Sequence, residues 1–212
     1  AHKRSTPEVL NRNQHPLRRA EISRYALSVV DRLQQAGYQA YLVGGCVRDL
    51  LLNLEPKDFD VATSATPEQV RAEFRNARVI GRRFKLVHVH FGREIIEVAT
   101  FRANHPQGDE DEDSNLSSRN ESGRILRDNV YGSLEDDAQR RDFTINALYL
   151  DASCERILDY ANGVHDIRNR LIRLIGDPEK RYQEDPVRML RAVRFAAKLD
   201  FDIEKHSAAP IP

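Results

Sequence analysis

Two aspartates one residue apart, Asp58 and Asp60, are the residues of this sequence best placed to do chemistry. Side chains alternate along an extended strand, so both carboxylates would point to one side while Phe59 and Val61 point into a core. Adjacent carboxylates repel each other unless a cation lies between them, and hard oxygen ligands suit Mg²⁺. The pair therefore indicates a magnesium site, although an Asp-x-Asp motif alone is more often a strand end or an Asx turn.

A glycine pair precedes the aspartates. Gly44 and Gly45 lie between an expected strand at residues 41–43 and an expected helix at residues 46–53. A glycine turn that opens a helix presents free backbone N–H groups, which favour phosphate. A lone Gly-Gly is usually only a turn. Next to two carboxylates at this spacing, it indicates phosphoryl or nucleotidyl transfer.

Four motifs follow one another within roughly residues 40–200. The first is Leu42-Val43-Gly44-Gly45-Cys46-Val47-Arg48-Asp49 with Lys57-Asp58-Phe59-Asp60-Val61-Ala62-Thr63. The others are Glu97-Val98-Ala99-Thr100-Phe101-Arg102, Arg140-Arg141-Asp142-Phe143-Thr144-Ile145-Asn146-Ala147 and Glu184-Asp185-Pro186-Val187-Arg188-Met189-Leu190-Arg191-Ala192-Val193-Arg194-Phe195. In this order they resemble the head-domain signature of the class II tRNA nucleotidyltransferase and bacterial poly(A) polymerase family, within the DNA polymerase beta-like nucleotidyltransferase superfamily.

The resemblance implies an α+β fold. We expect a polymerase beta-like nucleotidyltransferase head, a mixed antiparallel sheet flanked by helices, followed by the start of a helical neck. The expected divisions are a polar N-terminal arm at residues 1–17, the head at 18–160 and a truncated neck at 161–212. Residues 103–132 are polar and include five consecutive acids at 109–113, which predicts a flexible, solvated loop.

Local signals predict the elements that position the motifs. Apolar residues at helical spacing and capping residues predict helices at 18–36, from Thr66-Pro67 to about 74, and at 136–148. Strands at 84–91 and 94–101 would form a hairpin across Gly92-Arg93. Later elements are short strands near 148–151 and 156–160, a turn and helix at 163–170, and helices that start at Asp177-Pro178 and Asp185-Pro186.

The resemblance also implies roles for individual residues. Asp58 and Asp60 would bind the metals of a two-metal mechanism, and Glu97 would be the third catalytic carboxylate; its alternative is a strand-edge Glu in water. The RNA 3′-hydroxyl would attack the α-phosphate and release pyrophosphate. The expected nucleotide-binding residues are Gly44, Gly45, Arg48, Arg141, Asp142, Asp185, Arg188 and Arg191.

Two of the head motifs have structural alternatives. Arg48 could reach the triphosphate or pair with a neighbouring acid. By resemblance, Arg141 and Asp142 belong to the motif that reads the ribose. Otherwise they would join a mixed-charge helix face together with Asp136, Asp137 and Arg140.

The last motif also allows two interpretations. Asp185 and Arg188 are three residues apart and can act as a pair. In the related tRNA nucleotidyltransferases this pair is the amino-acid template for the incoming base. Alternatively, Asp185 caps a helix and Arg188 lies in solvent. A helical wheel predicts one packed apolar face, formed by Met189, Leu190, Val193, Ala196 and Ala197.

The run Ile80-Gly81-Arg82-Arg83-Phe84-Lys85-Leu86-Val87-His88-Val89 resembles the segment typical of bacterial poly(A) polymerases, its alternative being a strand with basic flanks. We therefore expect template-independent addition of AMP from ATP to RNA 3′ ends, with CCA addition to tRNA as the alternative. The three intact carboxylates argue against a non-catalytic nucleotide- or RNA-binding module. The Arg-Arg-Asp and Glu-Asp-x-x-Arg motifs argue against a nucleotidyltransferase of small molecules.

Composition narrows the class further. The 33 basic and 33 acidic residues cancel, which argues against a strong grip on RNA by this chain alone. Two cysteines, Cys46 and Cys154, make neither a disulfide framework nor a zinc site and fit a reducing cytoplasm. The resemblance implies that this cytoplasm is bacterial. No apolar run approaches the length of a transmembrane segment. The expected partners are ATP and an RNA 3′ end.

Overall fold

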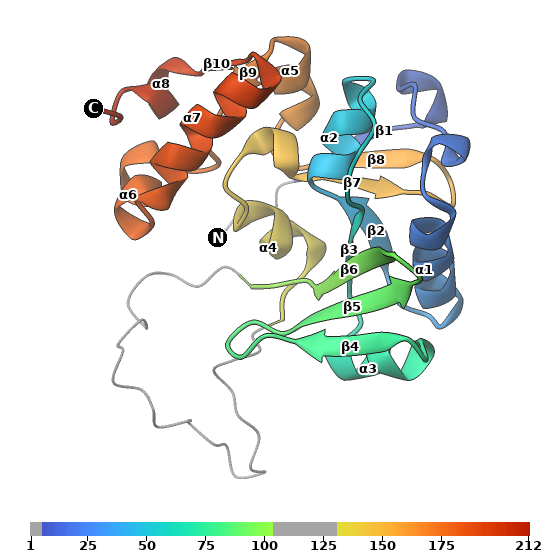
Figure 1. Ribbon diagram of the computed structural model, residues 1–212. Helices are drawn as coiled ribbons and strands as arrows, with labels where there is room; N and C mark the ends of the chain where they lie inside the picture. Colours follow the sequence, from blue (N-terminus) through green and yellow to red (C-terminus); the bar gives the residue numbers. More distant parts are fainter. Residues whose placement is uncertain (1–5, 104–130) are drawn as a thin grey trace.

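The computed structural model describes residues 6–103 and 131–212 and shows a central sheet flanked by helices (Figure 1). Within these residues the large sheet has eight strands in the order β1-β8-β7-β2-β3-β6-β5-β4. β3 pairs in parallel with β6, whereas the other described neighbours pair antiparallel, so the predicted mixed sheet is confirmed. The strands are β1 (Glu8–Leu10), β2 (Ala40–Val43), β3 (Asp60–Thr63), β4 (Ala77–Ile80), β5 (Leu86–Phe91), β6 (Glu94–Thr100), β7 (Leu148–Asp151) and β8 (Arg156–Asp159).

The helices cover the sheet and extend beyond it. They are α1 (Arg24–Gln35), α2 (Gly45–Leu51), α3 (Pro67–Glu73), α4 (Leu134–Gln139), α5 (Gly163–Arg168), α6 (Pro178–Glu184), α7 (Val187–Leu199) and α8 (Lys205–Ala208). Short 3-10 turns are η1 (Arg12–Gln14), η2 (Arg19–Glu21) and η3 (Thr144–Asn146), and β9 (Leu171–Ile172) pairs with β10 (Asp202–Ile203). In Figure 1, α6, α7 and α8 lie together beside the sheet, on the side away from α1. Among the described residues, no helix is both long and apolar enough to cross a bilayer.

The two faces of the sheet are packed differently. On one face, α1 buries Ala26, Val29, Val30 and Leu33 against the sheet as part of the main core. On the other face, Leu134 and Ala138 of α4 form a smaller cluster with Val43, Ala62, Phe101 and Tyr149. Since Val43 lies directly opposite Asp60, and paired residues share a face, the motif carboxylates lie on the face that carries this smaller cluster.

Several local predictions are confirmed. Thr66 forms a capping box with Gln69, and Pro67 is the first residue of α3. β5 and β6 form the expected hairpin, in which Phe91 pairs with Glu94. The two short strands appear as β7 and β8, and Asp177 caps α6 by accepting the N–H of Glu179. Each of these features depends on residues close together in the sequence.

Other predictions are corrected. The described part of the expected arm contains β1, which pairs with β8, and Leu10 and Leu17 are buried. The segment is packed because of this pairing with a distant strand, which the local sequence pattern does not show. The helix expected at 18–36 is interrupted, and α1 starts after the cap Ser23. The helix expected at 136–148 is wrong: α4 ends at Gln139, and an isolated bridge between Phe143 and Leu174 follows.

The remaining divisions stay predictions. The loop expected at 103–132 falls almost entirely outside the described residues. At its end, Tyr131 bridges to Arg102 and the Gly132 N–H donates to Phe101 O at 3.0 Å. The boundary expected between residues 160 and 161 is likewise a prediction, although backbone bonds such as Thr144 N–H to Arg173 O (3.0 Å) cross it.

Candidate active site

The three motif carboxylates gather on the face described above. Asp60 is the first residue of β3 and lies in register with Glu97 of β6. Asp58 precedes β3 by two residues and is exposed, whereas Phe59 and Val61 are buried. This burial pattern is the alternation expected from the sequence. A small open pocket lies beside Asp58 and includes Lys57 and Arg93 in its lining.

Burial and neighbouring charges shift the pKa of Asp60. Burial raises the pKa of Asp60 to about 6; the charges of Glu97 and Asp58 add to this, whereas Arg141 opposes it. A divalent cation would remove this repulsion, so the donor chemistry of Asp58, Asp60 and Glu97 fits a hard metal ion. Within the described residues, however, no group of three or more His, Cys, Asp or Glu side chains is already arranged to hold one.

The raised pKa leads to a stability prediction. A carboxyl whose folded pKa is about 6, against an ordinary 3.8, opposes folding once it is ionised, and this cost fades as the pH falls from 6 towards 4. Asp60→Asn should therefore stabilise the metal-free protein at pH 8 by about 1–3 kcal/mol, but change it little at pH 4. Thermal melts in chelator at both pH values measure this. Asp202→Asn, at an exposed aspartate, is the control, and an equal melting temperature for parent and Asp60→Asn at pH 8 contradicts the prediction.

The glycine turn is built as the sequence suggests. Gly44 has φ +79° and is the N-cap of α2, a backbone conformation that residues with a side chain rarely adopt. At Gly45, a Cβ would lie 3.2 Å from Nη2 of Arg48, so a small residue is favoured there too. Backbone conformation therefore favours glycine at position 44 and the Arg48 side chain favours a small residue at position 45, while contact of the turn with phosphate is a proposal.

Arg48 is buried and forms the acid pair that was one of its two alternatives. Its Nε and Nη2 donate to Oδ1 of Asp49 at 3.0 and 2.9 Å. Its Nη1 donates to Oδ1 of Asn146 at 2.7 Å, and the guanidinium lies 5.2 Å from the ring centre of Phe195. Arg48 thus joins the glycine-headed helix to η3 and α7.

A buried network holds Arg141 near the carboxylates. Nη2 of Arg141 donates to Oδ2 of Asp137 at 3.1 Å, and Nε donates to the hydroxyl of Tyr149 at 3.0 Å. Asp137 also accepts the Tyr149 hydroxyl at 2.6 Å and two bonds from Arg140. Burial opposes ionisation, but the charges of Arg141 and Arg140 hold the pKa of Asp137 below its usual value. The mixed-charge surface face is therefore wrong, because Asp137 is buried.

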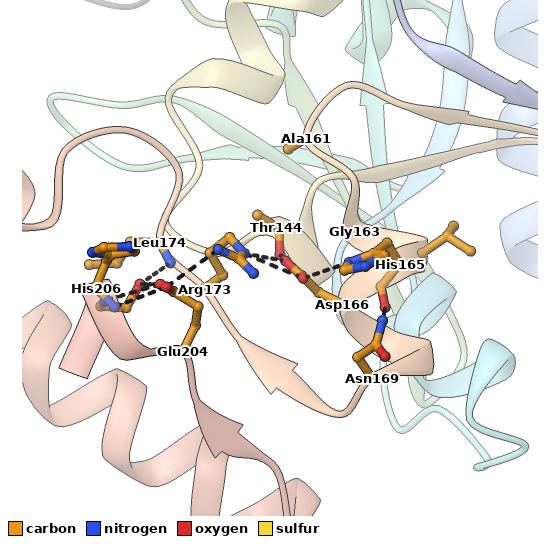
Figure 2. A network of polar contacts seen from close by, with 12 residues as sticks. Thr144, Ala161, Gly163, His165, Asp166, Asn169, Arg173, Leu174, Glu204 and His206 are labelled. Atoms are coloured by element: carbon orange, nitrogen blue, oxygen red, sulfur yellow. Dashed lines mark hydrogen bonds and ion pairs between the residues drawn. The ribbon is translucent and has the colours of Figure 1, made fainter.

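Two expected nucleotide-binding residues contact each other directly. Nη2 of Arg191 on α7 lies 2.9 Å from Oδ2 of Asp142, and the other carboxylate oxygen accepts the Phe143 N–H. The segment that follows is held by the network in Figure 2. Thr144 donates to Asp166 at 2.6 Å, and Arg173 bridges Asp166 to Glu204. These contacts set the position of the Arg-Arg-Asp motif.

Asp185 and Arg188 have separate partners. Asp185 is the C-cap of α6, and its Oδ1 accepts the N–H of Val187, the first residue of α7, at 3.1 Å. Nη1 of Arg188 donates to Arg181 O at 2.8 Å and lies 3.2 Å from Oε2 of Glu184. The N-cap of α7 is Pro186, without a side-chain cap bond, so the capping role expected of Asp185 is not confirmed. Arg188 is held by other groups and is only partly exposed. The two side chains therefore bind different groups, and the two residues meet through a backbone bond, Arg188 N–H to Asp185 O at 3.0 Å.

The expected packing face of α7 is only partly confirmed, because Met189 and Ala196 pack against the core but Ala197 is exposed. Leu190 and Val193 are 49% and 45% exposed, while Ala192 and Leu199 are buried. Phe195 completes the packed face by making an edge contact with Phe143. The Arg191–Asp142 pair and the Phe195 contacts set the rotation of the helix. A wheel drawn from hydrophobicity alone contains none of this information.

Sequence reasoning missed several supporting residues. They are Asn146 on Arg48, Tyr149 on Arg141, and His88, whose Nε2 lies 3.4 Å from Oε1 of Glu97. Asp137 was expected only as part of a surface face, not as a buried partner of Arg141. One signal was available for Asp137, because its three- and four-residue spacing to Arg140 and Arg141 suits pairing on a helix. The others depend on contacts distant in sequence.

Comparison with known proteins matches the part of the chain that contains the three motif carboxylates and the Arg-Arg-Asp motif. The model of the poly A polymerase head domain matches residues 40–173. Poly(A) polymerase I of Salmonella typhimurium is 59% identical over 204 residues, which are 96% of this chain and 43% of that protein. The CCA-adding enzyme of Lactobacillus helveticus is 41% identical over 186 residues, which are 88% of this chain and 43% of that protein.

Solved structures share the fold. The crystal structure of the Bacillus stearothermophilus CCA-adding enzyme in complex with CTP superposes with a TM-score of 0.69 at 40% identity. The match covers 86% of this chain and 40% of that one. The chain thus spans less than half the length of the relatives it matches.

Proposed function

The chain belongs to the poly(A) polymerase head-domain family, and from this premise we propose that the protein containing it adds AMP from ATP to RNA 3′ ends. Pyrophosphate is the second product. The observation that carries the proposal is the register that sets Asp60 beside Glu97, two residues from Asp58, with Arg141 near enough to lower the pKa of Asp60. The higher identity to a poly(A) polymerase than to a CCA-adding enzyme supports AMP addition.

The carboxylates provide the reaction centre in this proposal. Asp58 and Asp60 would hold divalent cations, which this family generally uses, and Glu97 completes the acidic face. When bound, such cations would neutralise negative charge on the triphosphate and lower the pKa of the RNA 3′-hydroxyl. The ion used is proposed to be Mg²⁺, because its ligands here are carboxylate oxygens.

The surrounding residues bind and orient the nucleotide. Arg141, fixed by Asp137 and Tyr149, adds positive charge beside the carboxylates without having to reorganise. Asp142 keeps lone pairs beyond its bonds to Arg191 and Phe143, and these can accept a ribose 2′-hydroxyl. Gly44 and Gly45 bring backbone close to the phosphates, and Arg48 supports this turn from behind.

Separate incubations with single nucleotides test the activity. The full-length protein receives an RNA primer, Mg²⁺ and one NTP at a time. A long ladder with ATP alone is expected. Extension that stops after one or two additions and needs CTP would instead favour CCA addition, and no extension with any NTP would contradict both.

Arg188 is proposed to control nucleotide choice together with Asp185. Arg188→Ala should reduce the preference for ATP over CTP, GTP and UTP by about tenfold to a hundredfold, because an unmatched buried polar group costs about 1–3 kcal/mol. The measurement is kcat/KM for the four nucleotides. Arg194→Ala, at an exposed arginine of the same helix, is the matched control. An unchanged ATP preference would remove the base-reading role and leave Asp185 and Arg188 with structural contacts only.

A further inference from the structure

The charge of this balanced chain is unevenly distributed. Residues 74–93, which contain β4 and β5, carry two histidines and no Asp or Glu. Their six Arg and Lys side chains leave 27 basic against 33 acidic residues in the rest of the chain. The six cations are Arg75, Arg78, Arg82, Arg83, Lys85 and Arg93. A net charge of zero therefore conceals a strongly basic hairpin.

The hairpin continues the row of catalytic residues across the sheet. Glu97 lies beside Asp60, His88 lies opposite Glu97, and Arg78 lies opposite His88. Residues in register share a face, and neighbouring strands are about 4.8 Å apart. This face thus carries carboxylates at β3 and β6, a histidine at β5 and the cation Arg78 at β4, about 10 Å from Glu97. This separation suits a polyanion whose end reaches the carboxylates.

The loop between β4 and β5 presents more cations in a defined shape. Residues 81–85 are all exposed. Gly81 has φ +94°, and a Cβ there would collide with the carbonyl oxygen of Phe84. The turn therefore needs glycine, and it places Arg82, Arg83 and Lys85 in solvent.

An exposed aromatic ring accompanies these cations. Phe84 is 53% exposed, and the guanidinium of Arg102 lies 4.3 Å from its ring centre. The backbone N–H of Arg102 donates to Asp137, so the ring rests on a group tied to the buried Arg141 network. Basic grooves with stacking aromatic rings are how proteins bind single-stranded nucleic acid.

We propose that the β4–β5 hairpin binds the single-stranded 3′ segment of the RNA primer. Arg78, Arg82, Arg83 and Lys85 contact its phosphates, and the Phe84–Arg102 pair stacks on one of its bases. The inference rests on the proposed AMP addition and adds the route by which the primer reaches the carboxylates. Bases stack without sequence readout, so the hairpin serves RNA ends of any sequence.

The test replaces two loop cations in the full-length protein. The double variant Arg82→Ala, Arg83→Ala should raise KM for an oligo(A) primer about tenfold or more, with little change in KM for ATP. Because single strands release about 0.7 counterions per neutralised phosphate, the slope of log KM for the primer against log salt should fall by about 1.4. The matched control removes two exposed arginines on other elements, Arg71→Ala and Arg168→Ala.

Two further variants separate charge from shape. Phe84→Ala should weaken primer binding about fivefold to a hundredfold, with the salt slope unchanged. Gly81→Ala should also raise the primer KM, although it removes no charge, because it distorts the loop. Circular dichroism and thermal melts confirm that each variant is folded.

The outcomes separate this inference from the proposed function. If the parent extends RNA with AMP but the double arginine variant keeps both its primer KM and its salt slope, the hairpin inference is overturned and the function stands. If the parent extends no RNA, the proposed function fails. Fluorescence anisotropy with labelled oligo(A) then decides the hairpin alone, since weaker binding by the double variant supports it and equal binding overturns it.

Discussion

Asp60→Ala in the full-length protein is expected to abolish AMP incorporation. Asp60 is the central one of the three motif carboxylates: it lies in register with Glu97, and the charges of Glu97 and Asp58 both raise its pKa. Its loss therefore removes the central proposed metal ligand. A bound metal ion supplies several kcal/mol of transition-state stabilisation, which corresponds to a loss of about a thousandfold or more in rate. Asp58→Ala should behave in the same way. Primer extension with ATP and Mg²⁺, measured under single-turnover conditions, gives the rate.

The fold should survive both substitutions. Asp58 is exposed, and Asp60 is held at a pKa of about 6 by an environment that disfavours its charge. Melting temperatures at or above that of the parent are therefore expected in chelator. Asp202→Ala removes an exposed aspartate from β10 and controls for the loss of one charge. Near-normal turnover in Asp58→Ala or Asp60→Ala would discard the metal-binding assignment.

The second large effect is expected at Asp137, which is 1% exposed. Asp137→Ala leaves the guanidinium groups of Arg140 and Arg141 without their carboxylate, together with the Tyr149 hydroxyl and the Arg102 N–H. Breaking a buried ion pair by removing one partner costs about 3–5 kcal/mol. For a protein of this size, that lowers the melting temperature by about 10 °C.

Asp137→Ala should also impair catalysis, because Arg141 would lose one of the two groups that orient it. The neighbouring Asp136→Ala is the matched control. Asp136 accepts the Ser133 N–H at the start of the helix, and losing this bond should lower the free energy of unfolding by only about 1 kcal/mol. Tyr149→Phe removes one hydroxyl, and its melting temperature should lie between those of Asp137→Ala and Asp136→Ala. A melting temperature of Asp137→Ala within two degrees of the parent would show that the network contributes little.

The local features of the fold could be predicted because their causes lie within a few residues. Alternation around Phe59 and Val61 placed Asp58 and Asp60 correctly, and Thr66 and Asp177 cap helices through N–H groups two or three residues away. The β5–β6 hairpin follows from a short turn between two alternating strands. Family resemblance suggested the proposed function, which no spacing supplies.

Longer-range features were predicted poorly. The segment that contains β1 has few apolar residues, yet it pairs with β8, almost 150 positions later in the chain. α4 ends early because the residues after it bond to Leu174 and Arg173, again far away in sequence. Local propensity cannot predict such contacts, because the residue that ends the helix or pairs with the strand lies far away in the sequence.

The order and spacing of the motifs pointed to the residues proposed to carry the chemistry, whereas packing between distant elements fixes what those residues contact. Arg48 binds Asn146, Arg191 pairs with Asp142, and α7 turns Leu190 and Val193 outward. The physical reason is the length of charged side chains. An arginine reaches partners on any element packed beside it, so its contacts depend on how helices and strands meet, while the backbone periodicity of a strand or helix is encoded locally.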